Sequence, residues 1–200
     1  LSAVITNLET CQAADLQRPP SLEKGTKQKI AGQVIFYSRT GNTRIVAEVI
    51  GETLGLPLQE IKDLKDRSGF FGFIGGMIDV RKNPITTISP ETVNLDGNEL
   101  LFIGSPIWGM KFAPAITTFL ERTDFSGKKV ILFTTTSSRM KQTAFDEYGE
   151  LIQKKGGTVV DAFFLKTFWK ESVEIRKEAE ELVAGKTESW VKKIQIDAPH

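Results

Sequence analysis

Residues 38–43 bring hydroxyl, amide and glycine groups together at a point where the chain could bind an anion. An apolar run at residues 34–37 precedes them and an amphipathic stretch at residues 43–54 follows, which predicts a loop between a buried strand and a helix. Backbone N–H groups at a helix N-terminus are unpaired and lie at the positive end of the helix dipole, so this loop would accept a phosphate. The candidate phosphate ligands are Ser38, Arg39, Thr40, Gly41, Asn42 and Thr43.

A capped turn without a ligand is the alternative interpretation of this loop. We favour the phosphate because Gly41 lets the backbone approach a ligand closely, and because a strand and a helix of the required kinds flank the loop. The loop is not a dinucleotide fingerprint, since no G-x-G-x-x-G pattern follows the strand. Residues 180–187 are not a Walker A loop either, because Glu180 occupies the position of its first glycine.

Two further loops are expected beside the first. Residues 106–109 follow an apolar run at residues 100–103, and Trp108 offers a flat face on which a ring system could stack. Trp108 as a core residue is the alternative. Residues 134–138 follow the apolar run at residues 130–133, and their hydroxyls and backbone amides could bind the edge of a heteroaromatic ring. The candidate ring contacts are Pro106, Ile107, Trp108, Gly109, Thr135, Thr136, Ser137 and Ser138.

The order of apolar patterns predicts a fold that would place these loops together. Predicted strands lie at residues 34–37, 58–61, 100–103, 130–133 and 158–165. Predicted helices lie at residues 43–54, 114–122, 144–152 and 171–194, the last with a break near Gly185 as an alternative. This alternation predicts an α/β fold: a doubly wound five-stranded parallel sheet of order 2-1-3-4-5 with helices on both faces. Strands 1 and 3 are then neighbours, and the loops that follow them line a ligand crevice.

Two segments fall outside this pattern. Residues 1–30 are weakly patterned and contain Cys11, so we expect a leader or linker there, followed by one binding domain at residues 31–197. Residues 62–98 are longer than a crossover helix requires. Their stretch rich in glycine and phenylalanine, residues 69–76, would either contact the ligand or join the core.

The composition argues against several classes of function. Lys and Arg number 26 against 25 Asp and Glu, too even a balance for a protein whose main partner is nucleic acid. No stretch approaches the ~20 apolar residues of a membrane span. The single cysteine allows no disulfide within the chain, and the single histidine, His200, is the last residue. We therefore expect neither a His-based catalytic unit nor a metal site. Any chemistry that this chain performs is expected to belong to a bound cofactor.

Two stretches of the sequence resemble a known family. Residues 34–54, VIFYSRTGNTRIVAEVIGETL, are similar to the opening of the flavodoxin-like family, and residues 101–135 are similar to its centre. The resemblance extends over residues 33–194, which implies a flavodoxin-like FMN-binding domain at residues 31–197. It implies FMN as the cofactor, with its phosphate held by residues 38–43 and its isoalloxazine ring held by residues 106–109 and 135–138.

Two departures from the family pattern bear on function. Electron-carrier flavodoxins are typically strongly acidic and often cover the outer ring face with a Tyr in the third loop. This chain has a formal charge of +1 and no aromatic residue between Ser137 and Phe145. We expect an FMN-dependent oxidoreductase that passes electrons from NAD(P)H or another donor to a quinone-like or flavin acceptor. A flavodoxin-type electron carrier is the alternative, and a fold relative that has lost its flavin and serves as an interaction or sensor domain is a third.

The expected partners follow from these functions. An oxidoreductase would meet a small-molecule donor and acceptor, NAD(P)H and a quinone, whereas a carrier would meet a redox protein. Related enzymes often dimerise near the flavin, so this chain could form a homodimer. The sequence does not identify the electron donor or the acceptor. The expected location is the cytoplasm, with a removed N-terminal signal as the alternative.

Overall fold

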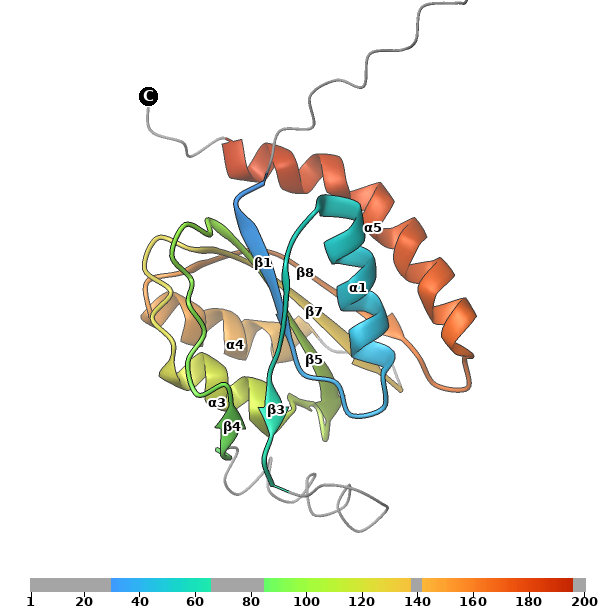
Figure 1. Cartoon of the computed structure of the whole chain (residues 1–200), viewed down its shortest axis with the longest axis horizontal. Helices are drawn as coiled ribbons and strands as arrows, with labels where there is room; N and C mark the ends of the chain where they lie inside the picture. The colour runs from blue at the N-terminus through green and yellow to red at the C-terminus, as the bar shows by residue number, and fades with distance from the viewer. Residues whose placement is uncertain (1–29, 66–84, 138–141, 196–200) are drawn as a thin grey trace, which may run out of the picture.

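The central element is a parallel sheet, and the computed structural model describes it within residues 30–65, 85–137 and 142–195. Its order is β2-β1-β5-β7-β8, formed by Leu58–Glu60, Gly32–Phe36, Leu100–Trp108, Lys129–Thr136 and Thr158–Lys166 (Figure 1). Counted along the chain, these strands have the order 2-1-3-4-5, so the predicted fold is confirmed. The central strands β5 and β7 contain continuous apolar runs because both of their faces are covered, whereas the edge strands β2 and β8 are partly exposed.

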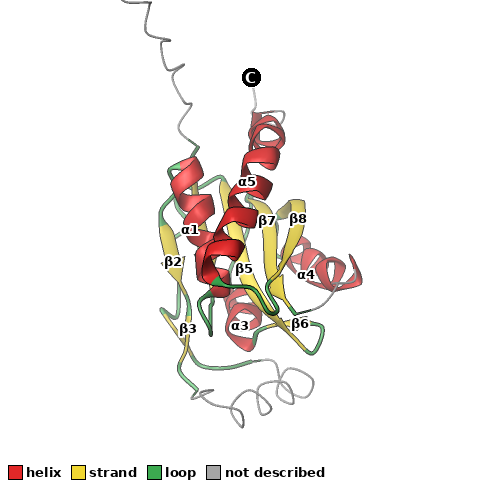
Figure 2. Cartoon of the chain, turned by 90° about the vertical axis from the view of Figure 1, so that its right-hand side faces the viewer, coloured by secondary structure: helices red, strands yellow, loops and turns green. Residues whose placement is uncertain are grey.

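Helices cover both faces of this sheet (Figure 2). α1 (Asn42–Leu54) and α5 (Ser172–Gln195) pack on one face, and α3 (Pro114–Arg122) and α4 (Gln142–Lys154) pack on the other. Successive residues of a strand point to opposite faces. In β7, Ile131 and Phe133 therefore join the core beneath α1 and α5, whereas Val130 and Leu132 join the core beneath α3 and α4.

Two predicted strand boundaries are wrong. β5 continues past its predicted end to Trp108, and β7 continues to Thr136, with register pairs such as Ser105 and Thr134 extending the ladder between them. Small and hydroxylated residues can continue a strand when the backbones of the neighbouring strands supply its hydrogen bonds. The break considered near Gly185 is absent, because α5 runs through this residue.

The described part of residues 62–98 forms a short antiparallel pair rather than a helix. β3 (Lys62–Asp63) pairs with β4 (Ile88–Ser89), and the Leu64 N–H donates to the Thr87 carbonyl at 2.9 Å. Residues 1–29 with Cys11, the stretch 69–76 and residues 196–200 lie outside the described residues, so the predictions made for them stay predictions. Within residues 30–65, 85–137 and 142–195, no helix is long and apolar enough to cross a membrane.

Candidate functional site

The loop between β1 and α1 presents an uncapped helix N-terminus. Gly41 is the N-cap residue, its φ is 94°, and no side chain caps the helix. The first intrahelical bond runs from the Ile45 N–H to the Gly41 carbonyl at 3.0 Å, so the preceding N–H groups have no partner within the helix. A Cβ at Gly41 would meet no atom within 4 Å, and the constraint on this position is therefore its left-handed backbone rather than space.

Ser38, the first candidate phosphate ligand, has a buried hydroxyl without a partner. Its Oγ is inaccessible to solvent and makes no hydrogen bond with any described residue. Leaving a buried hydroxyl unpaired costs about 1–3 kcal/mol, and such groups in native proteins call for an explanation. The Tyr37 N–H donates to the Gly104 carbonyl at 3.1 Å and so ties the start of the loop to β5. A buried hydroxyl without a partner among the described residues, beside helix N–H groups that have no partner within the helix, fits a polar ligand, and an anion above all.

The other residues of this loop differ in exposure. Arg39 and Thr40 are exposed at its tip, and Asn42 is half-buried. Thr43 is only 1% exposed, and its Oγ1 lies 2.7 Å from Oγ1 of Thr135, which is 4% exposed. This buried bond joins the first turn of α1 to the carboxyl end of β7. Thr135 is a predicted ring contact, and in the structure its hydroxyl contacts Thr43 of the segment 38–43.

The residues after β5 form a hairpin rather than an open loop. Trp108 pairs with Lys111 of β6 (Lys111–Phe112), and the two turn residues Gly109 and Met110 have φ values of 55° and 72°. Met110 is 43% exposed at the tip and was missed by the sequence analysis. A positive φ at a non-glycine residue is uncommon and marks a strained turn. Pro106 and Ile107 are partly buried at the base of this hairpin.

Trp108 packs as a core residue in this structure. It is 4% exposed, and its ring meets Tyr37 edge to face, with centroids 5.9 Å apart and an interplanar angle of 81°. The core interpretation of Trp108 thus describes its present packing, while stacking of its face on a ligand ring stays a prediction. Thr136 ends β7, Ser137 is exposed directly after it, and Ser138 lies outside the described residues.

Two contacts hold the hairpin in place from the α3 and α4 side. The Tyr148 ring stacks on Phe112 at a centroid distance of 3.9 Å, and its hydroxyl accepts the Phe112 N–H at 3.0 Å. Burial raises the pKa of the Tyr148 phenol. At the surface, the Lys111 ammonium lies 2.9 Å from the Glu147 carboxylate, and this hydrogen bond raises the pKa of Lys111.

Register places the three candidate segments along one edge of the sheet. Phe36 of β1 pairs with Gly104 of β5, and Pro106 of β5 pairs with Thr135 of β7, so the carboxyl ends of these strands are adjacent (Figure 1). The structure therefore brings residues 38–43, 106–110 and 135–137 to the same side of the molecule. In sheets of this order, ligands bind at the carboxyl ends of the two strands where the chain direction of the connections diverges, which are β1 and β5 here.

An exposed aromatic pair stands at the same edge and was missed by the sequence analysis. The Thr167 N–H donates to the Thr136 carbonyl at 2.9 Å, and the next two residues are Phe168 and Trp169. Trp169 is 89% exposed with a φ of 62°, and its ring lies 4.8 Å from that of Phe168. Two adjacent aromatic residues between a predicted strand and a predicted helix are the signal that could have found them.

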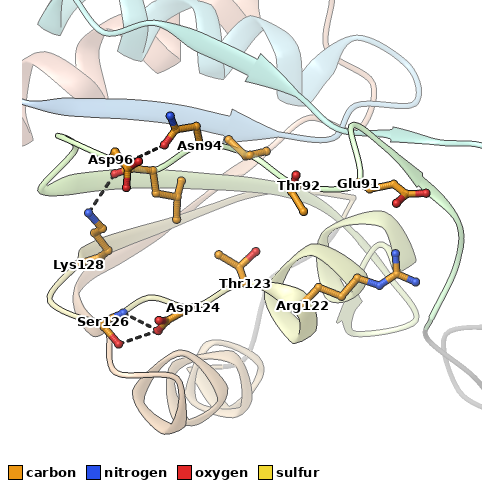
Figure 3. A pocket seen from close by; sticks show the side chains of 11 residues that line it. Glu91, Thr92, Asn94, Asp96, Arg122, Thr123, Asp124, Ser126 and Lys128 are labelled. Atoms are coloured by element: carbon orange, nitrogen blue, oxygen red, sulfur yellow. Dashed lines mark hydrogen bonds between the residues drawn. The ribbon is translucent and has the colours of Figure 1, made fainter.

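A cavity of about 460 Å³ lies at the opposite, amino edge of the sheet (Figure 3). Some of its charged side chains already make hydrogen bonds within the protein. The Lys128 ammonium donates to the Leu95 carbonyl at 3.0 Å, and the Asp124 carboxylate accepts two hydrogen bonds from Ser126. The cavity is lined by Glu91, Thr92, Val93, Asn94, Leu95, Asp96, Arg122, Thr123, Asp124, Ser126 and Lys128, none of which is a candidate ligand from the sequence.

Comparison with known proteins gives this architecture a family. A family model described as flavodoxin matches residues 75–174, which is half of the chain. The chain belongs to the flavodoxin family. The matched range includes the hairpin after β5 and the end of β7 but not residues 38–43, so the match does not bear on the predicted phosphate contacts.

Solved flavoproteins share this fold. A putative flavoprotein from Bacteroides uniformis ATCC 8492 aligns with a TM-score of 0.61 and 21% identity, covering 78% of this chain and 99% of its own. A flavoprotein from Lactobacillus acidophilus NCFM, solved in complex with FMN, aligns with a TM-score of 0.58 and 20% identity over 68% of this chain and 93% of its own. A search of curated proteins gave no significant match.

Proposed function

We propose that this flavodoxin-family chain binds FMN at the carboxyl edge of its sheet and works as an oxidoreductase. Residues 38–43 hold the phosphate, and residues 106–109 and 136–138 hold the ring, while Thr135 contacts Thr43 of the first segment. Electrons pass from NAD(P)H or another donor to a quinone-like or flavin acceptor. The observation that carries the proposal is the buried Ser38 hydroxyl, which has no partner among the described residues and lies in the segment that leads to the uncapped N-terminus of α1.

The chemistry of the loop fits the phosphate of FMN. A phosphate dianion only accepts hydrogen bonds, and the loop offers donors: the Ser38 hydroxyl, the free N–H groups of the first helical turn and the Asn42 amide. The flavoprotein from Lactobacillus acidophilus, which shares the fold, was solved with FMN bound. Bound FMN would supply the redox chemistry, while the chain's own residues bind the phosphate and orient the ring.

An oxidoreductase is favoured over a carrier by two features of the chain. Its formal charge is only +1, so its net charge does not supply the strong single-sign field that steers small redox partners together. No aromatic residue lies between Ser137 and Phe145 to cover a ring from the loop after β7. A ring face left open on that side would admit a small substrate.

The test is a visible spectrum followed by turnover. Purified protein reconstituted with FMN should show a flavin spectrum shifted from that of free FMN and should retain the flavin on a desalting column. With NADH or NADPH and a panel of quinones, turnover should exceed that of free FMN at the same concentration. Bound flavin with no turnover above this background would refute the oxidoreductase, and no bound flavin would refute the cofactor assignment.

An electron carrier is the second candidate, favoured by the aromatic pair Phe168 and Trp169. Exposed aromatic side chains are enriched where proteins dock, and this pair adjoins the end of β7. A carrier should take up electrons in two resolved one-electron steps on stepwise anaerobic reduction. Direct passage to the two-electron form, together with quinone turnover, would decide for the oxidoreductase.

A further inference from the structure

We propose that Thr135 is a positioning residue that aims the Thr43 hydroxyl at the flavin phosphate, and so makes the site distinguish FMN from riboflavin. The inference rests on the proposed function. It gives Thr135 a role other than the ring contact expected from the sequence.

The direction of the Thr135 side chain follows from strand alternation. Ile131 and Phe133 of β7 point into the core beneath α1 and α5, so Thr135, two residues on, points to the same face. Thr134 and Thr136 point to the other face. Thr135 is therefore the member of this threonine run that can reach the first turn of α1, and its Oγ1 lies 2.7 Å from Oγ1 of Thr43.

The number of available protons then decides which of the two threonine hydroxyls is the donor. Each hydroxyl carries one proton, and either could be the donor in the Thr43–Thr135 bond. A phosphate dianion has no proton to give, so a Thr43 hydroxyl that binds it must donate its own. Thr43 Oγ1 then accepts from Thr135, and its proton is directed into the loop. A chain of hydrogen bonds that ends on an anion is also strengthened by mutual polarisation.

Burial makes this arrangement consequential. Thr43 is 1% exposed and Thr135 is 4% exposed, so water does not replace a lost partner in this bond. Without the Thr135 hydroxyl, Thr43 Oγ1 loses its donor and its proton is no longer held in one direction. The loss falls on the phosphate interaction, because Thr43 lies in the phosphate loop rather than beside the ring.

The experiment measures dissociation constants of the full chain for FMN and for riboflavin by quenching of flavin fluorescence. Thr135→Val keeps the shape of the side chain and removes the hydroxyl, and Thr135→Ser keeps the hydroxyl. Thr135→Val should weaken FMN binding about tenfold, since it removes a bond that serves a charged ligand, and should change riboflavin binding less than about twofold. Thr135→Ser should stay within about twofold of the wild type for both ligands.

Thr118→Val is the matched control, because it removes an equally buried threonine hydroxyl from α3, outside the three candidate segments. Its ratio of riboflavin to FMN dissociation constants should equal that of the wild type. Equal weakening of both ligands by Thr135→Val would overturn the inference in favour of a ring contact or a structural role, and so would unchanged affinity for both. A wild type that binds neither flavin would instead overturn the proposed function.

Discussion

At the scale of single residues, the Ser38 hydroxyl is expected to lower the stability of the FMN-free protein and to strengthen FMN binding. Ser38→Ala removes a buried hydroxyl that has no partner among the described residues, so the FMN-free protein should be equally stable or more stable by up to about 3 kcal/mol. The same change should weaken FMN binding about tenfold or more, because it removes a donor to a charged phosphate. Urea unfolding of the FMN-free protein and a fluorescence titration measure the two effects.

Ser189→Ala is the control for that pair of measurements. The Ser189 hydroxyl donates to the Lys186 carbonyl on the exposed side of α5, so its loss should leave FMN affinity unchanged. A Ser38→Ala variant that loses stability and keeps its FMN affinity would show that the hydroxyl supports the fold rather than the ligand.

Asp161 ties β8 to α5 and gives the fold a titratable contact. Its Oδ2 accepts from the Trp190 indole at 2.7 Å and from the Lys186 ammonium at 2.9 Å. Burial alone would raise the pKa of Asp161, but the bonds from Trp190 and Lys186 outweigh burial and lower this pKa from the ordinary 3.8. A depressed carboxyl pKa stabilises the fold above the ordinary value, and this contribution is lost as pH falls through the folded-state pKa.

Asp161→Asn should therefore cost about 1–3 kcal/mol of unfolding free energy at pH 7. As pH falls below 3.8, the carboxyl of the unfolded chain is protonated first and that of the folded chain at its lower pKa, so the difference between variant and wild type should shrink across this range. Urea unfolding at several pH values measures this difference. A difference that stays constant across the acid range would mean that the charge of Asp161 does not contribute.

At the scale of elements, two glycines inside regular structure should respond in opposite directions to Ala. In β5, a Cβ on Gly104 would lie 2.1 Å from Cζ of Phe133, whose ring is held by Phe163, so Gly104→Ala should destabilise by about 1–3 kcal/mol. In α5, a Cβ on Gly185 would meet no atom within 4 Å, so Gly185→Ala should stabilise by about 0.5–1 kcal/mol. Thermal unfolding compares them. A destabilising Gly185→Ala would argue for a real interruption of α5 at this residue.

The elements also show how far the sequence could predict the structure. The strands and their order could be predicted because strands buried on both faces are continuous apolar runs. The ends of β5 and β7 could not be predicted in this way. An apolar pattern indicates which residues are buried, whereas Ser105 and Thr134 belong to their strands because their backbones pair. Within the candidate site, the position of residues 38–43 between a strand and a helix could be predicted from the flanking apolar patterns, while their binding of a phosphate stays a prediction. The contact between Thr43 and Thr135 could not be predicted, since a bond across 92 residues depends on strand register that no local pattern carries.

At the scale of the whole molecule, two regions on opposite edges of the sheet could receive a ligand. The carboxyl edge holds the phosphate loop, the hairpin after β5 and the end of β7. The amino edge holds the cavity lined by residues 91–96 and 122–128 (Figure 3). The polar groups of the cavity are partly paired within the protein. The carboxyl edge has an uncapped helix N-terminus and the buried Ser38 hydroxyl, which has no partner among the described residues.

Hydrogen exchange followed by mass spectrometry can show in one experiment at which of these two edges FMN binds. Saturation with FMN should slow amide exchange in residues 38–44, 105–112 and 134–137, because ligand contacts suppress the local opening that exchange requires. Exchange in residues 91–96 and 122–128 should not change, since these loops lie at the other end of the strands. Ser38→Ala at the same FMN concentration should show less protection in residues 38–44 than the wild type. Protection that appears at the amino edge, with none in residues 38–44, would move the ligand to the cavity and remove the basis for the FMN site.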